Sequence, residues 1–169
     1  MDPNRIYAAM ITLMGVPSCA TAAGPARQPT LAGSLVTHSF YVGSWQCKGT
    51  SYSSTEGQPD AMWDAVVKVE PELGGTWLSV KMTGPGAQRT IEHKGYDPET
   101  KRWTHVAMIN DGTWISASSP GWTGSDLVFI PDDRSDASRS TFTKLGEASY
   151  SHVVTLGAER VWGKICTKL

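Results

Sequence analysis

The sequence of 169 residues lacks any extended cluster of basic residues. Charged side chains make up only 18% of the chain, the formal net charge is −1, and the longest basic cluster is the pair Lys101-Arg102. A nucleic-acid surface needs lysines and arginines gathered on one face, so we expect no nucleic-acid partner. The sequence also lacks an apolar run of the roughly 20 residues that a membrane-crossing helix needs, so we expect no transmembrane span.

The short motifs that identify common enzyme classes are also missing. The chain contains no Gly-x-Ser-x-Gly nucleophile elbow, no phosphate-binding glycine loop and no paired metal-binding motif. We therefore predict no resident cofactor, and haem or metal binding by a group of histidines stays an alternative. Whether the protein is an enzyme is open at this point, and a non-catalytic role is favoured.

The first 22 residues have the composition of a secretory signal peptide. Arg5 precedes the apolar run Ile6–Val16, and Ala20-Thr21-Ala22 is the best cleavage site. We predict that the protein is secreted or periplasmic. The alternative is a lipid anchor at Cys19, because Val16-Pro17-Ser18-Cys19 loosely resembles a lipoprotein box.

Cysteine is scarce, and cleavage after Ala22 would leave only Cys47 and Cys166. Two cysteines in an exported chain predict one disulfide. By closing a long loop, this bond would stabilise the fold by about 4–5 kcal/mol in the chain-entropy model. The alternation of the two strands argues against it. Cys47 alternates with Trp45 and is expected to face inward, whereas Cys166 alternates with Lys164 and is expected to face outward. A bulge or a strand end would have to reconcile them.

Glycine and tryptophan are abundant, with 17 and seven residues, and from Gly43 onward the apolar pattern has a period of two. Turn signals recur at about 8–12 residues, which is typical of an all-β sandwich or barrel. About ten strands are predicted, at Ser44–Ser53, Ala61–Glu70, Thr76–Thr83, Gln88–Tyr96, Arg102–Ile109, Thr113–Ser118, Asp126–Ile130, Ser140–Lys144, Ser149–Leu156 and Arg160–Thr167.

Short loops force neighbouring strands to be antiparallel, and closure removes the two exposed edges of such a meander. We therefore predict a closed antiparallel up-and-down β-barrel in residues 41–169. Residues 23–40 are expected to form a linker. Within Leu31–Val42 a short helical turn is expected to plug one end of the barrel.

Two stretches resemble known families. Gly43-Ser44-Trp45-Gln46-Cys47-Lys48-Gly49 resembles the Gly-x-Trp-x-x-x-Gly opening of calycin-like barrels. The stretch from Gly95 to Trp103, with Asn110-Asp111-Gly112 downstream, resembles the central signature of the DUF1579 family of small bacterial barrels. The resemblance covers roughly residues 41–167 and implies a lipocalin-like fold rather than an activity. Lys101 stands where related motifs often carry glycine, which implies a local change in the turn.

Three histidines alternate with apolar residues, which places them on faces that we interpret as inward. With three aromatic residues they are the predicted ligand-binding residues: His93, His105, His152, Tyr150, Trp63 and Trp103. A pairing symmetric about residue 99 would put His93 opposite His105, and a slip of one residue would turn His105 outward. The alternatives are a wet cavity with hydrogen-bonded histidines, a metal or haem site, and a wrongly assigned face. Trp77 and Trp162 alternate with lysines and are expected to face outward.

These patterns favour a barrel that binds a small apolar or amphipathic molecule. A cyclase or isomerase that uses a lumenal histidine or Tyr150 as acid or base is a second hypothesis. An interaction protein whose barrel is packed solid is the third.

Overall fold

The computed structural model describes residues 38–52, 59–85, 89–133 and 137–169, and its regular structure is almost entirely β-strand. The first half of the barrel comprises β1 (Gly43–Tyr52), β2 (Pro59–Glu72), β3 (Trp77–Thr83), β4 (Thr90–Asp97), β5 (Arg102–Ile109) and β6 (Trp114–Ser119), with the short 3-10 helix η2 (Leu73–Gly75) before β3. The second half comprises β7 (Trp122–Thr123), β8 (Asp126–Pro131), β9 (Ser138–Gly146), β10 (Ser149–Leu156) and β11 (Glu159–Lys168).

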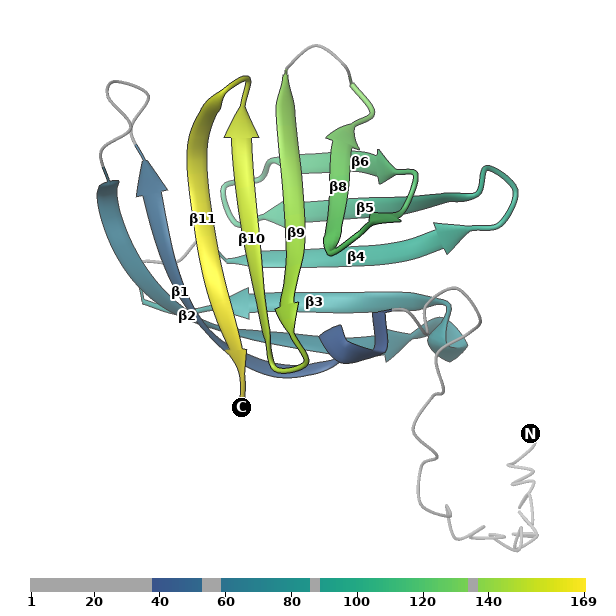
Figure 1. The fold of residues 1–169 in the computed structure, drawn as a ribbon, viewed down its shortest axis with the longest axis horizontal. Helices are drawn as coiled ribbons and strands as arrows, with labels where there is room; N and C mark the ends of the chain where they lie inside the picture. The colour runs from purple at the N-terminus through teal and green to yellow at the C-terminus, as the bar shows by residue number, and fades with distance from the viewer. Residues whose placement is uncertain (1–37, 53–58, 86–88, 134–136) are drawn as a thin grey trace, which may run out of the picture.

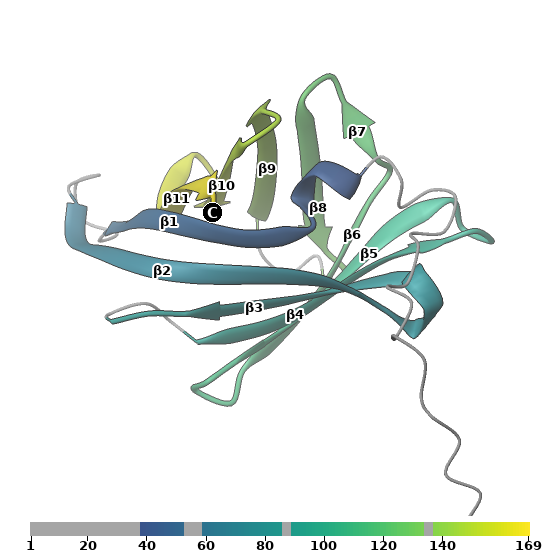
Figure 2. The same cartoon turned by 90° about the horizontal axis from the view of Figure 1, so that it is seen from below.

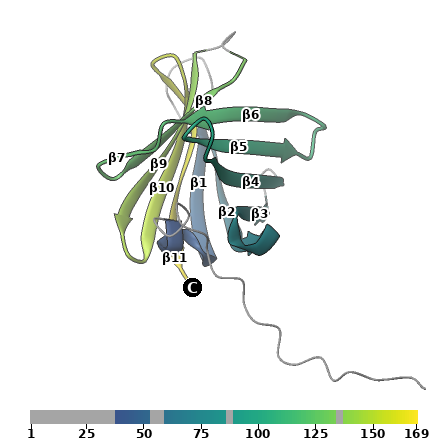
Figure 3. The same ribbon diagram turned by 90° about the vertical axis from the view of Figure 1, so that its right-hand side faces the viewer.

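Ten of these strands form a closed antiparallel barrel, which confirms the predicted fold. Consecutive strands pair from β1 to β6 and from β8 to β11, β1 pairs with β11, and β6 pairs with β8 to complete the circle. The β6–β8 seam is short, with only Ala117↔Pro131 and Ser118↔Ile130 in register. β7 pairs only with the start of β8, in a hairpin that protrudes from the barrel (Figure 3).

The barrel is flattened into two layers. Strands β8–β11 cross steeply over β3–β6, and the long curved strands β1 and β2 connect the two layers along one side (Figures 1 and 2). Inward-facing side chains alternate with exposed ones, as on β2, where Trp63, Ala65, Val67 and Val69 are buried. The lumen between the layers is therefore the core of the protein.

Cys47 and Cys166 lie directly opposite each other on β1 and β11 and form a disulfide with an S–S distance of 1.97 Å. The predicted disulfide is confirmed. The expectation that Cys166 faces outward is wrong, because both side chains are fully buried. No bulge is needed, since Lys164 also faces the lumen. We had assumed that Lys164 is exposed, and this assumption assigned the two faces of β11 the wrong way round.

The glycine that ends the Gly-x-Trp-x-x-x-Gly motif has a packing role. Gly49 lies opposite Trp63 across the β1–β2 pair. A Cβ atom at Gly49 would lie 2.1 Å from the Trp63 ring, which real contacts do not allow. The indole therefore lies across the glycine backbone inside the lumen.

A single 3-10 turn, residues 38–41, covers one end of the lumen, and we call it the cap. Its end at Tyr41 is anchored by the Trp45 indole, which donates a hydrogen bond to the Tyr41 carbonyl at 2.8 Å. At its other end, the Trp122 indole donates to Nδ1 of His38 at 3.4 Å. The cap occupies part of the range in which we expected a helical plug.

The predicted signal peptide, the lipid-anchor candidate Cys19 and linker residues 23–37 lie outside the described residues. Among the helices that the structure does describe, none has the length and apolar character to cross a membrane.

Lys101 ends the turn between β4 and β5 with a φ of 55°, in the left-handed region that favours glycine. The start of this turn is held by Asp97, whose carboxylate accepts hydrogen bonds from the Glu99 backbone at 2.8 Å and the Thr100 hydroxyl at 2.7 Å. The lysine therefore adopts a conformation that the glycine of related motifs would adopt without strain.

Candidate functional site

Five acidic, lysine or histidine side chains on the barrel strands are buried in the lumen, and we call them the lumenal charge cluster. Each points inward from a strand whose other face is exposed or half-buried. They are Glu92 and Lys94 on β4, His105 on β5, His152 on β10 and Lys164 on β11. Ionisable groups are rarely buried in this number without a role, because each loses its hydration when it leaves water.

One side of the cluster is an ion pair with a third partner. The Lys94 amine lies 2.5 Å from Oε2 of Glu92, and His105 Nε2 lies 3.1 Å from the same oxygen. The other carboxylate oxygen accepts a hydrogen bond from the Thr90 hydroxyl at 3.3 Å. The Glu92 side chain is only 6% exposed and that of Lys94 only 1%, so water contributes little to this network.

The pKa values on this side follow from burial and from the pairing. Burial alone would raise the pKa of Glu92, but Lys94, the hydrogen bond with His105 and the charge of Lys164 outweigh it and hold that pKa well below its usual range. Burial lowers the pKa of Lys94, and Glu92 opposes that shift. Burial and the charge of Lys94 lower the pKa of His105, so its imidazole is neutral near pH 7.

Lys164 stands on the other side of the cluster with weaker partners. It lies opposite His152 on one neighbouring strand and opposite Gly49 on the other. Its amine donates to the Met82 sulfur at 3.3 Å and lies 5.6 Å from the centre of the Trp162 ring. Burial lowers the pKa of Lys164 to about 8; the charge of Glu92 opposes this shift and the charge of Lys94 adds to it. Across the described part of the chain, no carboxylate forms an ion pair with this amine.

His152 is a neutral side chain in a tight aromatic environment. Its Nε2 lies 2.6 Å from the Ser140 hydroxyl, and its ring stacks on Phe142 with 3.7 Å between the ring centres. Burial and the charge of Lys164 lower its pKa well below the usual value. A histidine with so low a pKa is a weak general base near neutral pH.

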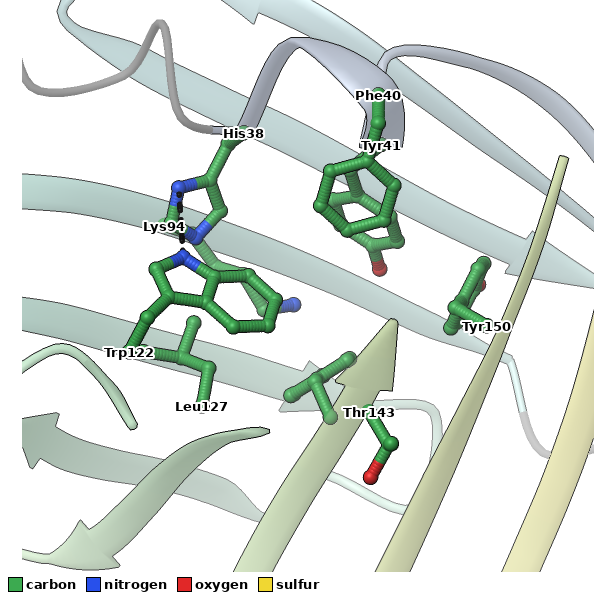
Figure 4. A pocket seen from close by; sticks show the side chains of 9 residues that line it. His38, Phe40, Tyr41, Lys94, Trp122, Leu127, Thr143 and Tyr150 are labelled. Atoms are coloured by element: carbon green, nitrogen blue, oxygen red, sulfur yellow. Dashed lines mark hydrogen bonds between the residues drawn. The ribbon is translucent and has the colours of Figure 1, made fainter. Parts of the chain in front are cut away.

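A small cavity lies beneath the cap, with Lys94 of the cluster in its wall (Figure 4). Its volume is about 10 Å³, which is room for about one water molecule. Aromatic side chains from the cap, from β7 and from β9–β10 form most of its wall, and the Lys94 amine lies 4.6 Å from the centre of the Phe142 ring. The full lining is His38, Phe40, Tyr41, Lys94, Trp122, Leu127, Phe142, Thr143 and Tyr150.

Five of the six predicted ligand-binding residues face the lumen, and they are His105, His152, Tyr150, Trp63 and Trp103. The expectation that His93 faces it is wrong. The β4–β5 turn pairs Lys94 with His105 and His93 with Val106, one residue away from the predicted pairing. His93 therefore lies on the outer face, where its Nδ1 is 3.5 Å from a carboxylate oxygen of Glu72. Whether the other five bind a ligand stays a prediction.

Of the two tryptophans that we expected on the outer face, one lies there and the other does not. Trp77 does lie there, over Gly95, where a Cβ atom would be 2.5 Å from the indole. Trp162 instead faces the lumen, with its ring 6.3 Å from that of Trp63 and 4.7 Å from that of His152. The expectation for Trp162 is wrong for the same reason as that for Cys166.

The charged members of the cluster were missed because we read lysine and glutamate as surface residues. One signal could have found Lys164. If Cys166 must face inward to reach Cys47, the period of two along β11 carries Lys164 and Trp162 inward as well. No comparable constraint acts on Glu92 and Lys94.

No protein-family model matches the chain, and no curated protein matches it. The resemblance to the DUF1579 family therefore rests on the short motifs alone. Within the described ranges, no group of three or more His, Cys, Asp or Glu side chains is arranged to hold a metal ion.

Proposed function

We propose that this protein is an exported barrel that binds a small amphipathic molecule in its lumen. The observation that carries the proposal is the lumenal charge cluster, buried beneath an aromatic cap. A core built only for stability gains from apolar packing, because buried ion pairs are often replaceable by apolar side chains without loss. Aromatic walls with a few polar groups are typical of small-molecule sites. The disulfide supports export.

The cavity must enlarge to hold a ligand, because about 10 Å³ is too small for any organic ligand, and we expect the cap to be the wall that moves. The His38 end of the cap is held by the Trp122 hydrogen bond and by the Trp103 ring, whose centre is 3.9 Å from that of His38. Trp122 belongs to the β7 hairpin, which pairs with the barrel at only two positions. The His38–Trp122 contact is therefore the expected point of opening.

Fluorescence titration with N-phenyl-1-naphthylamine, a neutral apolar probe, tests this function. We expect saturable binding at one site, and a several-fold change in affinity in Trp122→Ala, which removes a wall of the cavity. Trp114→Ala is the matched control, because Trp114 is 68% exposed on the barrel surface. Its affinity should equal that of the wild type.

The small cavity favours a second candidate, an interaction protein with a solid core. That function predicts no saturable probe binding in the wild type or in Trp122→Ala, and only lower stability in the variant. An acid–base enzyme has less support, because burial lowers the pKa values of His105 and His152 and raises that of Tyr150.

A further inference from the structure

The lumen carries an excess of positive charge. Among the described residues the lumen buries two amines, Lys94 and Lys164, but one carboxylate, Glu92, while His105 and His152 are neutral near pH 7. A buried charge without a counter-ion is costly, since neither water nor a fixed opposite charge stabilises it. An anion at this place would balance the charges.

The two amines differ in their capacity to receive that anion. Lys94 is already bound to Glu92 at 2.5 Å. The one hydrogen-bond acceptor found for Lys164 within the described ranges is the Met82 thioether, a weak acceptor at 3.3 Å. Lys164 therefore has donor capacity that an oxyanion would use.

The strand register places Lys164 within reach of the cap cavity. Phe142, His152 and Lys164 lie side by side across β9, β10 and β11, and Phe142 also lines the cavity. Tyr150, another lining residue, precedes His152 by two positions, which is about 7 Å along a strand. A ligand whose apolar body fills the aromatic cavity would thus place its head group near Lys164.

We propose that the ligand is an amphiphile with one anionic head group and that Lys164, rather than Lys94, is its charge partner. This inference rests on the proposed function and names the ligand class. The head group, a carboxylate or a similar oxyanion, accepts hydrogen bonds from the Lys164 ammonium, and the apolar body lies against the aromatic rings below the cap. A neutral ligand leaves the excess charge in place, and a cationic ligand adds to it.

Binding of the anion is coupled to the proton on Lys164. The pKa of this amine, about 8 in the free protein, lies well below that of an ordinary lysine because of burial. A bound anion raises it, since an opposite charge favours the protonated form. The preference for the anion should therefore be complete at pH 7 and weaken as the pH rises above 8.

Displacement of N-phenyl-1-naphthylamine by three ligands with the same chain tests the inference: decanoate, 1-decanol and decylamine. On the wild type at pH 7 we expect decanoate to compete at least about tenfold more strongly than decanol, and decylamine to be weakest. In Lys164→Met, decanoate should lose this advantage while decanol competes as before. In Lys164→Arg, which keeps the charge, the preference should persist.

The outcomes separate this inference from the function on which it rests. If decanol competes as strongly as decanoate on the wild type, or if Lys164→Met keeps the preference, the inference is overturned and the binding function stands. If the probe itself does not bind, the proposed function fails and the inference with it. A preference that does not weaken between pH 7 and pH 9.5 also contradicts the role of Lys164.

Discussion

Lys94 and Lys164 are both buried in the same lumen, but the two sides of the barrel give their amines different hydrogen-bond and charge partners. On the β4–β5 side, Lys94 has a carboxylate at 2.5 Å, and that carboxylate has further partners in His105 and Thr90. On the β9–β11 side, Lys164 has a sulfur atom at 3.3 Å. Burial alone therefore does not identify a functional charge, and the quality of its partners does.

The difference has opposite consequences for stability. The ion pair on the β4–β5 side stabilises the fold only as a unit, because either member alone would be an uncompensated buried charge. The Lys164 amine destabilises the fold while no ligand is bound. A shift of its pKa from 10.5 to about 8 corresponds to about 3 kcal/mol, at about 1.4 kcal/mol per pKa unit.

Removing the Glu92 carboxylate should have the largest effect, because it forms the ion pair with Lys94 and its charge also favours the protonated form of Lys164. We expect Glu92→Gln to lower the free energy of unfolding by about 3–5 kcal/mol in a denaturant titration at pH 7. The double variant Glu92→Gln with Lys94→Met should recover most of the loss, since it also removes the unpaired ammonium. A single variant as stable as the wild type would show that the pair is not formed.

The same substitution at the two lysines should change stability in opposite directions. Lys94→Met leaves Glu92 unpaired on its own side and should cost about 3 kcal/mol at pH 7, whereas Lys164→Met should stabilise by about 1–3 kcal/mol. Between pH 8 and 10.5 the unfolded wild type holds a proton on Lys164 that the folded state has released. Wild-type stability therefore rises with pH in that window, and the advantage of Lys164→Met shrinks. Two losses of equal size would contradict the comparison.

The fold could be predicted from the sequence because its signals are local. The period of two, the turn residues and the two cysteines were enough to predict ten strands, the closure of the barrel and the disulfide. The ranges Arg102–Ile109 and Ser149–Leu156 match β5 and β10 in full. The two-residue strand β7 was missed because a period needs more residues than that to be visible.

The site was harder to predict, because which side chains of a strand point into the lumen depends on the strand register, and the register is fixed only by the whole barrel. A shift of one residue in the β4–β5 pairing exchanged His93 for Glu92 and Lys94 in the lumen. The hydrophobicity pattern does not reveal that Glu92 and Lys94 are buried, because charged residues in a sequence are normally assigned to the surface. The partners that make Lys94 stable inside come from side-chain contacts that no single-strand pattern contains.

The neutral histidine on the Lys164 side should be visible in the acid limb of the stability curve. The folded-state pKa of His152 lies well below 6.5, so below about pH 6.5 the unfolded chain binds a proton that the folded chain does not. Stability from this group is therefore lost as the pH falls. We expect His152→Leu to lower the slope of stability against pH by up to about 1.4 kcal/mol per pH unit below about pH 6.5. An unchanged slope would mean that His152 is protonated in the folded state.

The smallest effect is expected at His93, which the sequence pattern did not distinguish from His105. His93 lies outside the barrel and faces Glu72, with side chains that are 33% and 40% exposed. Exposed pairs of this kind contribute about 0–1 kcal/mol, so His93→Ala should change the free energy of unfolding by less than about 0.5 kcal/mol. His105→Ala, at a buried position that contacts Glu92, should cost at least about 2 kcal/mol. Because a slip of one residue in the β4–β5 pairing would put both histidines on the same face and give them similar effects, denaturant titration of both variants tests the register that brings Glu92 and Lys94 into the lumen.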